Sequence, residues 1–278
     1  MSAVDGWREQ LGSWAIPPRI LSAAPESPYG FPTALFRARG EQAVHDEPTP
    51  TTSRALEVLA RGGRVLDVGC GGGATSLPLA GRAGVVVGVD AQEDMLEGFL
   101  ANARAAGVQG VAVHGRWPDV AHEVEPVDVA VAGHILYNVP ELATFVRTLA
   151  TVSRRRVVFE LTDHHPLHWM NDLWLRFHGV QRPEGPTAQD ALVALIELGL
   201  DAQIERWVDP RRTGGFDRRD DALGLVRRRL CLAAERDDEI LAALGDRLGE
   251  RNGCWSAGPD GQTLATIRCD ISARSAPP

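Results

Sequence analysis

The sequence predicts an α/β fold in which a doubly wound, mostly parallel sheet carries helices on both faces. From residue 49 to residue 161, short apolar segments alternate regularly with segments of helical periodicity. The apolar segments are continuous rather than alternating, as expected for strands that are covered on both faces. The chain has 278 residues and is 44% hydrophobic, which suffices for a large core.

The first element of this regular part is a helix that starts after Thr49, a suitable N-cap, with Pro50 at its first position. This helix is expected to reach Ala60. Residues 64–68 then form an apolar strand that ends in a run of glycines, and a second helix is expected to begin near Ala74. The order helix, strand, glycine run and helix places the glycines at one edge of the sheet.

The regular alternation continues through residue 161. The helix after the second strand carries apolar residues at helical spacing, and Gly107 is a natural stop for it. Further strands are expected at residues 85–90, 110–114, 127–133 and 156–161, and further helices near Ala91 and Pro140.

The pattern changes after residue 161. A helix is expected at 187–199, with Thr187 as its cap and Gly199 as its stop. Two last strands are expected at 204–208 and 263–271. About 50 residues lie between those strands, too many for a hairpin loop. We therefore expect a helical insertion at about 210–262, with helices near 217–231 and 236–249.

Residues 1–48 differ from the rest of the chain because they combine many prolines with many aromatic residues. The prolines exclude one long helix, and the aromatic residues argue against a disordered tail. Two interpretations stay open: a strap packed on the main domain of residues 49–278, or a lid over an active site.

The charge composition excludes several kinds of chemistry. The sequence contains no lysine, so all 29 basic residues are arginine. A pyridoxal phosphate Schiff base, a Walker-type lysine and a lysine general base are therefore excluded. The net charge of −8 argues against a general nucleic-acid binder, because neutralisation of phosphates drives that affinity.

The cysteines and the N-terminal residues bear on the cellular compartment. None of the four cysteines, Cys70, Cys231, Cys254 and Cys269, belongs to a CxxC pair, so neither a zinc site nor a redox motif is indicated. The first residues lack the features of a signal peptide, and no apolar run is long enough to span a membrane. We expect a cytoplasmic protein without a membrane partner.

The segment VLDVGCGGGATS carries the most information about function. Glycines at alternate positions allow a sharp turn and a close approach to a ligand. The spacing Gly69-x-Gly71-x-x-Ala74 also satisfies the dinucleotide fingerprint, although that match alone is weak. Asp67 favours another ligand, because a carboxylate at this loop repels a pyrophosphate and attracts a sulfonium or an ammonium group.

A second acid, Asp90, closes the strand at 85–90, where a carboxylate can accept both hydroxyls of a ribose. Each acid also has a structural interpretation. Asp67 is alternatively a cap of a helix or turn, and Asp90 is alternatively an N-cap of the next helix.

These residues resemble a known family. DVGCGGG resembles the D/E-x-G-x-G-x-G loop of class I S-adenosylmethionine-dependent methyltransferases. The similarity extends to VGVDAQEDMLEGFLANARAAGV and to VDVAVAGHILYNVPEL, and covers roughly residues 53–161. The resemblance implies a Rossmann-like sheet of seven strands whose last strand is antiparallel.

The resemblance also implies S-adenosyl-L-methionine as the cofactor. Asp67 would lie near its ammonium group, and Asp90 would bind its ribose. The glycines implied to border the amino-acid part of the cofactor are Gly69, Gly71 and Gly73.

The adenine side of the implied site departs from the family pattern. Ala91 and Met95 would lie against the adenine. Many members have a Gly-Asp pair after the third strand, but here Arg116 follows Gly115. Either Trp117 packs on the adenine or a backbone group replaces the missing acid, and the alternative is that Trp117 is a core residue.

Methyl transfer requires alignment, a dry site and, for a protic acceptor, a base. His134 occupies a position after the fourth strand that often faces the cofactor, although a structural histidine is the alternative. A metal is not indicated, because His164, His165 and His168 have no acids at helical spacing. The candidates to contact the acceptor are His134, Tyr137, Asn138, Glu160, Asp163, His164 and His165.

We therefore interpret the chain as an S-adenosylmethionine-dependent methyltransferase that acts on a small-molecule acceptor. One alternative is a regulatory protein that binds the cofactor without catalysis, and another is an NAD-dependent oxidoreductase. The acceptor, the general base and the oligomeric state stay open at this point.

Overall fold

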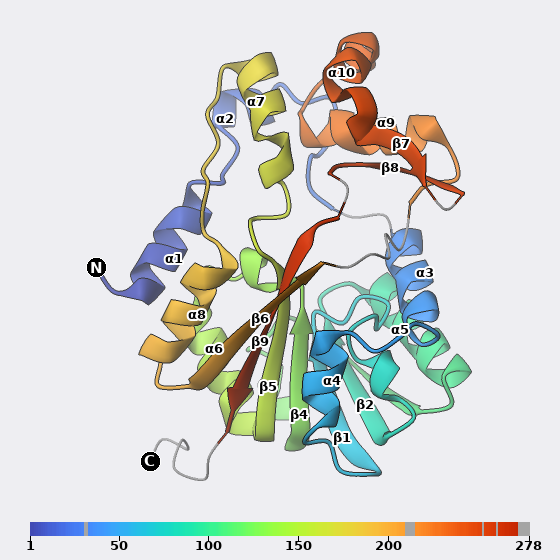
Figure 1. Cartoon of the computed structure of the whole chain (residues 1–278), viewed down its shortest axis with the longest axis vertical. Helices are drawn as coiled ribbons and strands as arrows, with labels where there is room; N and C mark the ends of the chain where they lie inside the picture. The colour runs from blue at the N-terminus through green and yellow to red at the C-terminus, as the bar shows by residue number, and fades with distance from the viewer. Residues whose placement is uncertain (31–32, 209–214, 252, 260, 272–278) are drawn as a thin grey trace.

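The computed structural model describes residues 1–30, 33–208, 215–251, 253–259 and 261–271. Its centre is one seven-stranded sheet, with helices on both faces and a smaller group of elements beyond one end of the strands (Figure 1). The strands of this sheet are β1 (Gly63–Val68), β2 (Ala83–Asp90), β3 (Gln109–His114), β4 (Val127–Gly133), β5 (Ser153–Thr162), β6 (Asp201–Val208) and β9 (Thr263–Asp270).

The strand order is β3-β2-β1-β4-β5-β9-β6. Strands β1 to β5 pair in parallel, whereas β9 is antiparallel to both of its neighbours, β5 and β6. The predicted fold class and the antiparallel last strand are therefore confirmed. Because the chain reverses its direction of winding at β1, the carboxyl ends of β1 and β4 meet at the topological switch point.

The two faces of the sheet are covered by different helices (Figure 1). One face buries Leu142, Phe145, Ala191 and other apolar residues, and the opposite face buries a second cluster that includes Phe99. The helices on the first face are α1 (Ala3–Gly12), α6 (Leu142–Val152) and α8 (Ala188–Glu197), and those on the second are α4 (Pro50–Leu56) and α5 (Glu93–Ala105).

Two of the predicted helix caps are present. The Thr49 hydroxyl accepts a hydrogen bond from the backbone N–H of Thr52, and Pro50 is the first residue of α4. Thr187 forms a reciprocal capping box with Asp190 at the start of α8. Asn138, whose position before Pro140 also suits an N-cap, does not cap α6, because the N-cap of that helix is Glu141.

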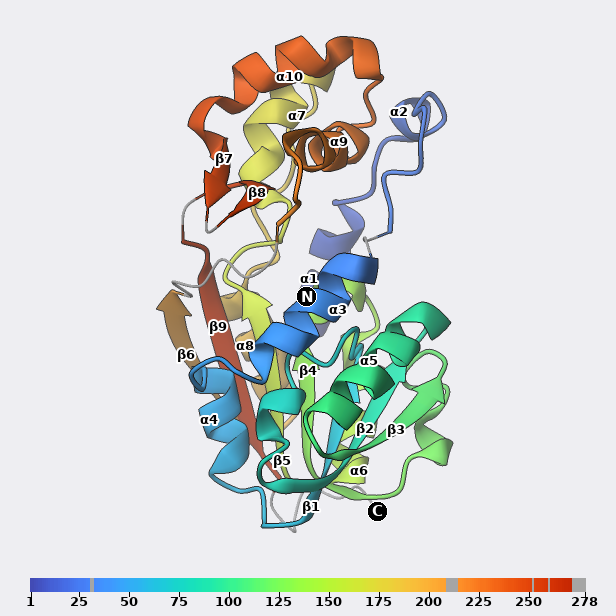
Figure 2. The same ribbon diagram turned by 90° about the vertical axis from the view of Figure 1, so that its right-hand side faces the viewer.

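A smaller cluster of apolar residues lies beyond the carboxyl ends of the parallel strands (Figures 1 and 2). We call this part the cap. Its core joins α2 (Pro18–Leu21) to elements from the second half of the chain through residues such as Ile20 and Met170. The other elements of the cap are α7 (Asn171–His178), α9 (Arg219–Arg229), α10 (Asp237–Leu244) and the hairpin of β7 (Leu248–Arg251) and β8 (Cys254–Ala257).

The hairpin corrects the prediction of a helix at 236–249. Helix α10 ends at Leu244 because Gly245 adopts a φ of +53°, which a right-handed helix cannot continue. The two helices expected near 217–231 and 236–249 are α9 and the shorter α10. The expected start of the insertion at residue 210 lies outside the described residues.

The helix expected to begin near Ala74 is also absent. The chain forms turns after Gly73 and then a single 3₁₀ turn at Leu77–Leu79. Pro78 lacks a backbone N–H, and this short segment ends at Gly81, so no α-helix develops. The glycine loop therefore does not lead into a helix N-terminus.

The N-terminal residues form three short helices rather than one. Trp7 of α1 is fully buried in the core of the sheet domain, and its indole N–H donates to the Val139 carbonyl over 2.9 Å. Helix α3 (Thr33–Ala43) lies instead on α5, on the other side of the molecule (Figure 1). Phe31 and Pro32, which belong to this aromatic and proline-rich segment, lie outside the described residues.

No helix in the described part of the chain combines the length and the apolar character that a membrane span requires. The longest of these helices, α5, has 13 residues, whereas a span needs about 20.

Candidate active site

The glycine loop connects β1 to the carboxyl end of β2. Gly69, Gly71 and Gly73 have φ angles of +70°, +49° and +87°, which L side chains rarely adopt. The backbone N–H of Gly69 donates to the Val89 carbonyl over 2.8 Å. The N–H of Gly71 donates to Oδ2 of Asp90 over 3.0 Å. The loop is therefore fixed against the end of β2 by backbone geometry and by one carboxylate.

Asp67 is buried beneath this loop, with 1% of its surface exposed. Its Oδ2 accepts a hydrogen bond of 2.6 Å from the Ser76 hydroxyl, whereas its Oδ1 is buried and has no hydrogen-bond partner. Burial raises the pKa of Asp67 to about 7, and repulsion from Asp90 and Glu160 contributes to the same effect. A cation or a hydrogen-bond donor next to Oδ1 would relieve this cost.

Asp90 lies in a more open environment at the end of β2. Its Oδ1 accepts from the backbone N–H of Gln92 over 3.0 Å, in addition to the Gly71 contact of Oδ2. The N-cap of α5 is Gln92, so Asp90 supports the start of the helix from a position before its cap. The carboxylate thus links the glycine loop to α5.

The other cofactor residues expected near β2 lie around Asp90. The N–H of Gly115 donates to the Asp90 carbonyl over 3.0 Å, which places the end of β3 beside the end of β2. Met95 is buried in the first turn of α5, and Ala91 and Arg116 are exposed.

Trp117 lies in the core of the sheet domain. Only 9% of its surface is exposed, and its indole N–H donates to the Phe145 carbonyl of α6 over 3.1 Å. This is the core position that the sequence left open as the alternative. We therefore leave Trp117 out of the site proposed below.

Helix α3 covers the glycine loop from outside, an arrangement that the sequence did not predict. A Cβ atom on Gly40 would overlap the carbonyl oxygen of Gly72, so the two backbones are in direct contact. The side chain of Asn102 on α5 donates to the carbonyls of Arg37 and Gly72 over 3.0 and 2.9 Å. A buried asparagine on the apolar face of a predicted helix is the signal that could have revealed it.

The end of β4 brings His134 next to β5. His134 is one of two non-glycine residues of the described chain with a positive φ, at +56°. Its backbone N–H donates to the Glu160 carbonyl over 2.6 Å, and its Nε2 lies 3.1 Å from Oε1 of the Glu160 side chain. The His134 side chain is 45% exposed, whereas that of Glu160 is 13% exposed.

Two other acceptor-side candidates are held by neighbouring groups. The hydroxyl of Tyr137 donates to the Thr162 carbonyl over 2.8 Å, and burial raises its pKa. The ring of His165 stacks on that of Trp14 with centroids 3.8 Å apart, and burial lowers its pKa to about 3.

The last three candidates also lie near the segment after β5 or at the end of β4. Asp163 forms an ion pair with Arg206 over 2.8 Å. His164 and Asn138 are exposed, and the ring of His164 stacks on that of His168. Among the residues that the structure describes, no group of three histidine, cysteine or acidic side chains is arranged to hold a metal ion.

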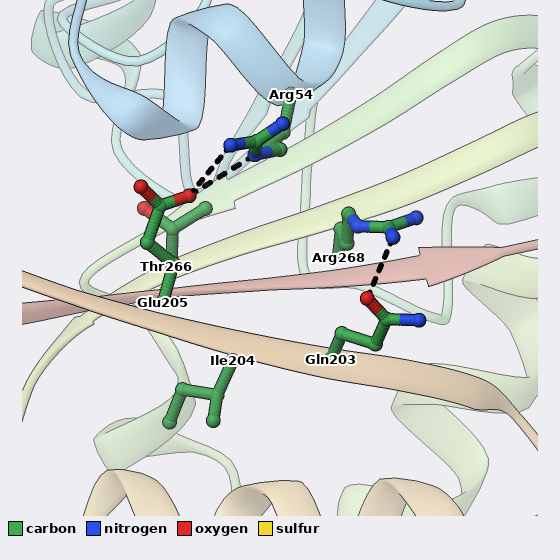
Figure 3. A pocket seen from close by; sticks show the side chains of 6 residues that line it. All are labelled: Arg54, Gln203, Ile204, Glu205, Thr266 and Arg268. Atoms are coloured by element: carbon green, nitrogen blue, oxygen red, sulfur yellow. Dashed lines mark hydrogen bonds and ion pairs between the residues drawn. The ribbon is translucent and has the colours of Figure 1, made fainter.

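A cavity of about 240 Å³ lies elsewhere on the sheet, beside α4 (Figure 3). Arg54 pairs with Glu205, and Arg268 donates to Gln203 over 2.6 Å, so these polar groups already satisfy one another. None of the predicted site residues lines it. The lining residues are Arg54, Gln203, Ile204, Glu205, Thr266 and Arg268.

The residues present fit S-adenosylmethionine better than a dinucleotide. The buried Oδ1 of Asp67 has no donor, and Asp90 and Glu160 add negative charge around the same loop. A pyrophosphate is repelled by these acids, and the described chain after Gly73 offers no α-helix N-terminus to bind it. A ligand with an ammonium and a sulfonium group complements the same charges.

Comparison with known proteins gives the same assignment. A family profile described as "Methyltransferase domain" matches residues 65–156. The ubiquinone biosynthesis O-methyltransferase of Rhizobium rhizogenes is 34% identical over 189 residues, which cover 61% of this chain and 74% of that protein. The chain belongs to the class I S-adenosylmethionine-dependent methyltransferase family.

Other members of the family are similar over a smaller part of their length. The ubiquinone biosynthesis O-methyltransferase of Rhizobium johnstonii is 31% identical over 127 residues, which cover 44% of this chain and 48% of that protein. The match thus spans about half the length of that relative. A methyltransferase structure from Thiobacillus denitrificans in complex with S-adenosyl-L-homocysteine has the same fold, with a TM-score of 0.52 and 18% identity over 88% of this chain and 100% of that chain.

Proposed function

We propose that this protein transfers a methyl group from S-adenosylmethionine to a small-molecule acceptor. The observation that carries the proposal is the buried carboxyl of Asp67, whose Oδ1 has no partner beneath a glycine loop that is hydrogen-bonded to Asp90. A positively charged cofactor is the ligand that relieves the cost of burying this acid.

The residues of the loop have distinct roles in this proposal. Asp67 lies near the ammonium group of the cofactor, and Asp90 accepts hydrogen bonds from its ribose. Gly69, Gly71 and Gly73 provide a backbone without side chains along its amino-acid part. Cofactor residues proposed nearby are Ala91, Met95, Gly115, Arg116 and His134.

The bound cofactor supplies an activated methyl group on a sulfonium. The protein's contribution is then to align the acceptor, to exclude water and to take a proton where the acceptor carries one. The cap and the N-terminal helices lie beyond the same strand ends and are suited to cover the site (Figure 2). We propose that residues 1–48 serve as part of this cover.

A small molecule is the acceptor that the observations favour. Matching relatives are named for O-methylation in ubiquinone biosynthesis. The net charge of −8 argues against an RNA acceptor, whose phosphates would be repelled.

Calorimetry tests the cofactor part of the proposal. Titration of the full chain with S-adenosylhomocysteine should give one binding site, whereas NAD should give no heat of binding. Binding of NAD in place of S-adenosylhomocysteine would favour the oxidoreductase alternative.

A screen with a labelled methyl donor separates an enzyme from a regulatory protein. We expect label in the product with at least one of a set of phenols, alcohols and amines. Cofactor binding without transfer to any acceptor would support the regulatory alternative.

A further inference from the structure

We propose that His134 is the general base for the acceptor, that Glu160 positions it, and that the acceptor is a hydroxyl or an amine. These groups need a base more than a thiol does, because a thiol ionises readily near neutral pH. This inference rests on the methyltransferase function proposed above. It adds a base and a class of nucleophile, which that function alone does not specify.

His134 and Glu160 lie at the same end of the sheet as Asp67. Asp67 is opposite Val131 in the register of β1 and β4, and Glu160 is opposite Gly133, two residues further along β4. Side chains two residues apart on a strand point to the same face. Asp67 and Glu160 therefore project from one face of the sheet, with His134 directly after Gly133 at the strand end.

The backbone of His134 has an uncommon conformation. Residues other than glycine uncommonly adopt a φ of +56°, although histidine does so more often than most, and such backbone conformations concentrate at functional sites. The hydrogen bond from the His134 N–H to the Glu160 carbonyl holds this conformation. The strained backbone brings Nε2 of the ring to 3.1 Å from the Glu160 carboxylate.

The contact of Nε2 with Glu160 leaves the other ring nitrogen of His134, Nδ1, able to accept a proton. With a proton on Nε2 facing Glu160, Nδ1 carries a lone pair. No residue that the structure describes forms a hydrogen bond with Nδ1. The ring is partly exposed at the carboxyl ends of β4 and β5, where a ligand of an open α/β sheet binds.

The other candidate bases are engaged elsewhere. Tyr137 donates its proton to a backbone carbonyl, and the ring of His165 is stacked against Trp14. Nδ1 of His165 also accepts the backbone N–H of Leu167 over 3.2 Å. Asp163 is paired with Arg206. Unlike these groups, His134 is paired to a carboxylate and has a side chain that is 45% exposed.

The proposed step is balanced. The acceptor oxygen or nitrogen forms a bond to the methyl carbon as the bond from that carbon to sulfur breaks. The electron pair of the broken bond stays on sulfur, which becomes a neutral thioether. The proton of the acceptor moves to Nδ1 of His134, and the resulting imidazolium is stabilised by Glu160.

The tautomer of His134 tests the pair without any acceptor. Long-range ¹H–¹⁵N spectra of ¹⁵N-histidine protein should show the neutral ring protonated on Nε2, and Glu160→Met should abolish this preference. Glu123→Met is the matched control, because Glu123 lies 3.9 Å from the exposed His122. A ring unprotonated on Nε2, or a tautomer that Glu160→Met leaves unchanged, would overturn the proposal.

The rate tests the base and the class of acceptor. His134→Gly suits the positive φ and should keep the fold. With phenol, alcohol, amine and thiol acceptors and labelled S-adenosylmethionine, we expect methylation on oxygen or nitrogen, with kcat at least 100-fold lower in the variant. Because His134 is also proposed to lie near the cofactor, the KM for S-adenosylmethionine should rise as well, but by a smaller factor than kcat falls, and added imidazole should restore part of the rate. If a thiol is the only acceptor, or if His134→Gly retains half of the wild-type kcat, the assignment of His134 as the base is contradicted.

The proposal can fail separately from the methyltransferase function. Calorimetry with S-adenosylhomocysteine should give equal stoichiometry for the wild type and His134→Gly. Binding that persists together with an unchanged tautomer in Glu160→Met overturns the base alone. A wild type that does not bind S-adenosylhomocysteine overturns the function on which it rests.

Discussion

Two regions of the molecule bury charges of opposite sign. The carboxyl ends of β1 and β2 bury acids, and the segment after β5 buries an arginine. At the first, Asp67 and Asp90 are paired with no cationic side chain among the described residues. At the second, Arg182 is 6% exposed, stacks between Trp14 and Trp174, and donates to the carbonyls of Trp14 and Ala15, with no described acid as its partner.

This difference indicates that the acids of the first region bind a ligand, whereas the arginine of the second region stabilises the fold. The acids at β1 and β2 retain a buried acceptor, Asp67 Oδ1, which a cationic ligand would satisfy. Arg182 of the second region also has a buried atom without a partner, its Nε. Its other donors bind backbone carbonyls and its planar faces contact two indole rings, so it fixes the N-terminal segment to the cap. Substitutions in the first region should therefore change ligand binding, and those in the second should change stability.

The largest effect is expected for Gly71→Val. Gly71 has a φ of +49° and lies 3.4 Å, measured from a Cβ built on it, from the ring of Phe36. A β-branched side chain there distorts the loop, so binding of S-adenosylhomocysteine should fall at least 100-fold in calorimetry while the circular dichroism spectrum is retained. Gly81→Val is the control, because a Cβ there meets nothing within 4 Å. Wild-type affinity in Gly71→Val would show that the loop does not approach the ligand.

The next effect concerns the pH dependence of stability. The pKa of Asp67 is about 7 in the fold, above its ordinary 3.8. Between these values the native state binds more protons than the unfolded chain, so this group makes the free energy of unfolding decrease as pH rises through that window. Asp67→Asn should remove this decrease and raise the stability of the ligand-free protein at pH 8 by about 4 kcal/mol.

Urea titrations at pH 5 and pH 8 measure this difference. The variant should match the wild type more closely at pH 5, where Asp67 is protonated. It should also bind S-adenosylhomocysteine more weakly at pH 8. Equal loss of stability at both pH values would contradict the account of Asp67.

A smaller effect on binding is expected for Asp90→Ala. The variant loses the hydrogen bond to Gly71 and the acceptor for the ribose, so binding of S-adenosylhomocysteine should weaken by about 1.5–3 kcal/mol. Calorimetry measures this change. Asp94→Ala, an exposed acid of the same region on α5, should leave the affinity unchanged. Unchanged affinity in Asp90→Ala would remove Asp90 from the site.

The smallest effect belongs to the second region. The ring of His165 stays neutral above pH 5 because its pKa is about 3, and it stacks on Trp14. His165→Gln should lower the free energy of unfolding by about 1 kcal/mol, the scale of an aromatic pair, equally at pH 5.5 and pH 8. The affinity for S-adenosylhomocysteine should not change. A loss of affinity would place His165 in the binding site.

The features of these two regions differ in how well the sequence predicts them. Strands, caps and the pairing of Asp67 with a glycine loop depend on residues that are close in sequence, and these were predicted. The contact of Ser76 with Asp67 depends on how the loop between them folds. That of α3 with Gly72 depends on tertiary packing, for which the polar Asn102 on the apolar face of α5 was an available signal. The prediction of a helix near Ala74 was wrong. The glycine spacing is typical of a loop that leads into a helix, but Pro78 opposes an α-helix in this segment.

The acceptor side shows the same limit. His134 and Glu160 were both candidates, but 26 residues separate them, and only the parallel pairing of β4 with β5 brings the side chains together. The sequence could not distinguish His134 from His165 either. Their environments differ through Trp14, which comes from the far N-terminal part of the chain.

The most direct measurement is a crystal structure of the full chain soaked with S-adenosylhomocysteine. We predict density for the nucleoside across the ends of β1 and β2, with its ammonium nitrogen within hydrogen-bond reach of Asp67 Oδ1 and its ribose on Asp90. Density elsewhere on the molecule, or an empty loop in a crystal that instead binds NAD there, would contradict the assignment.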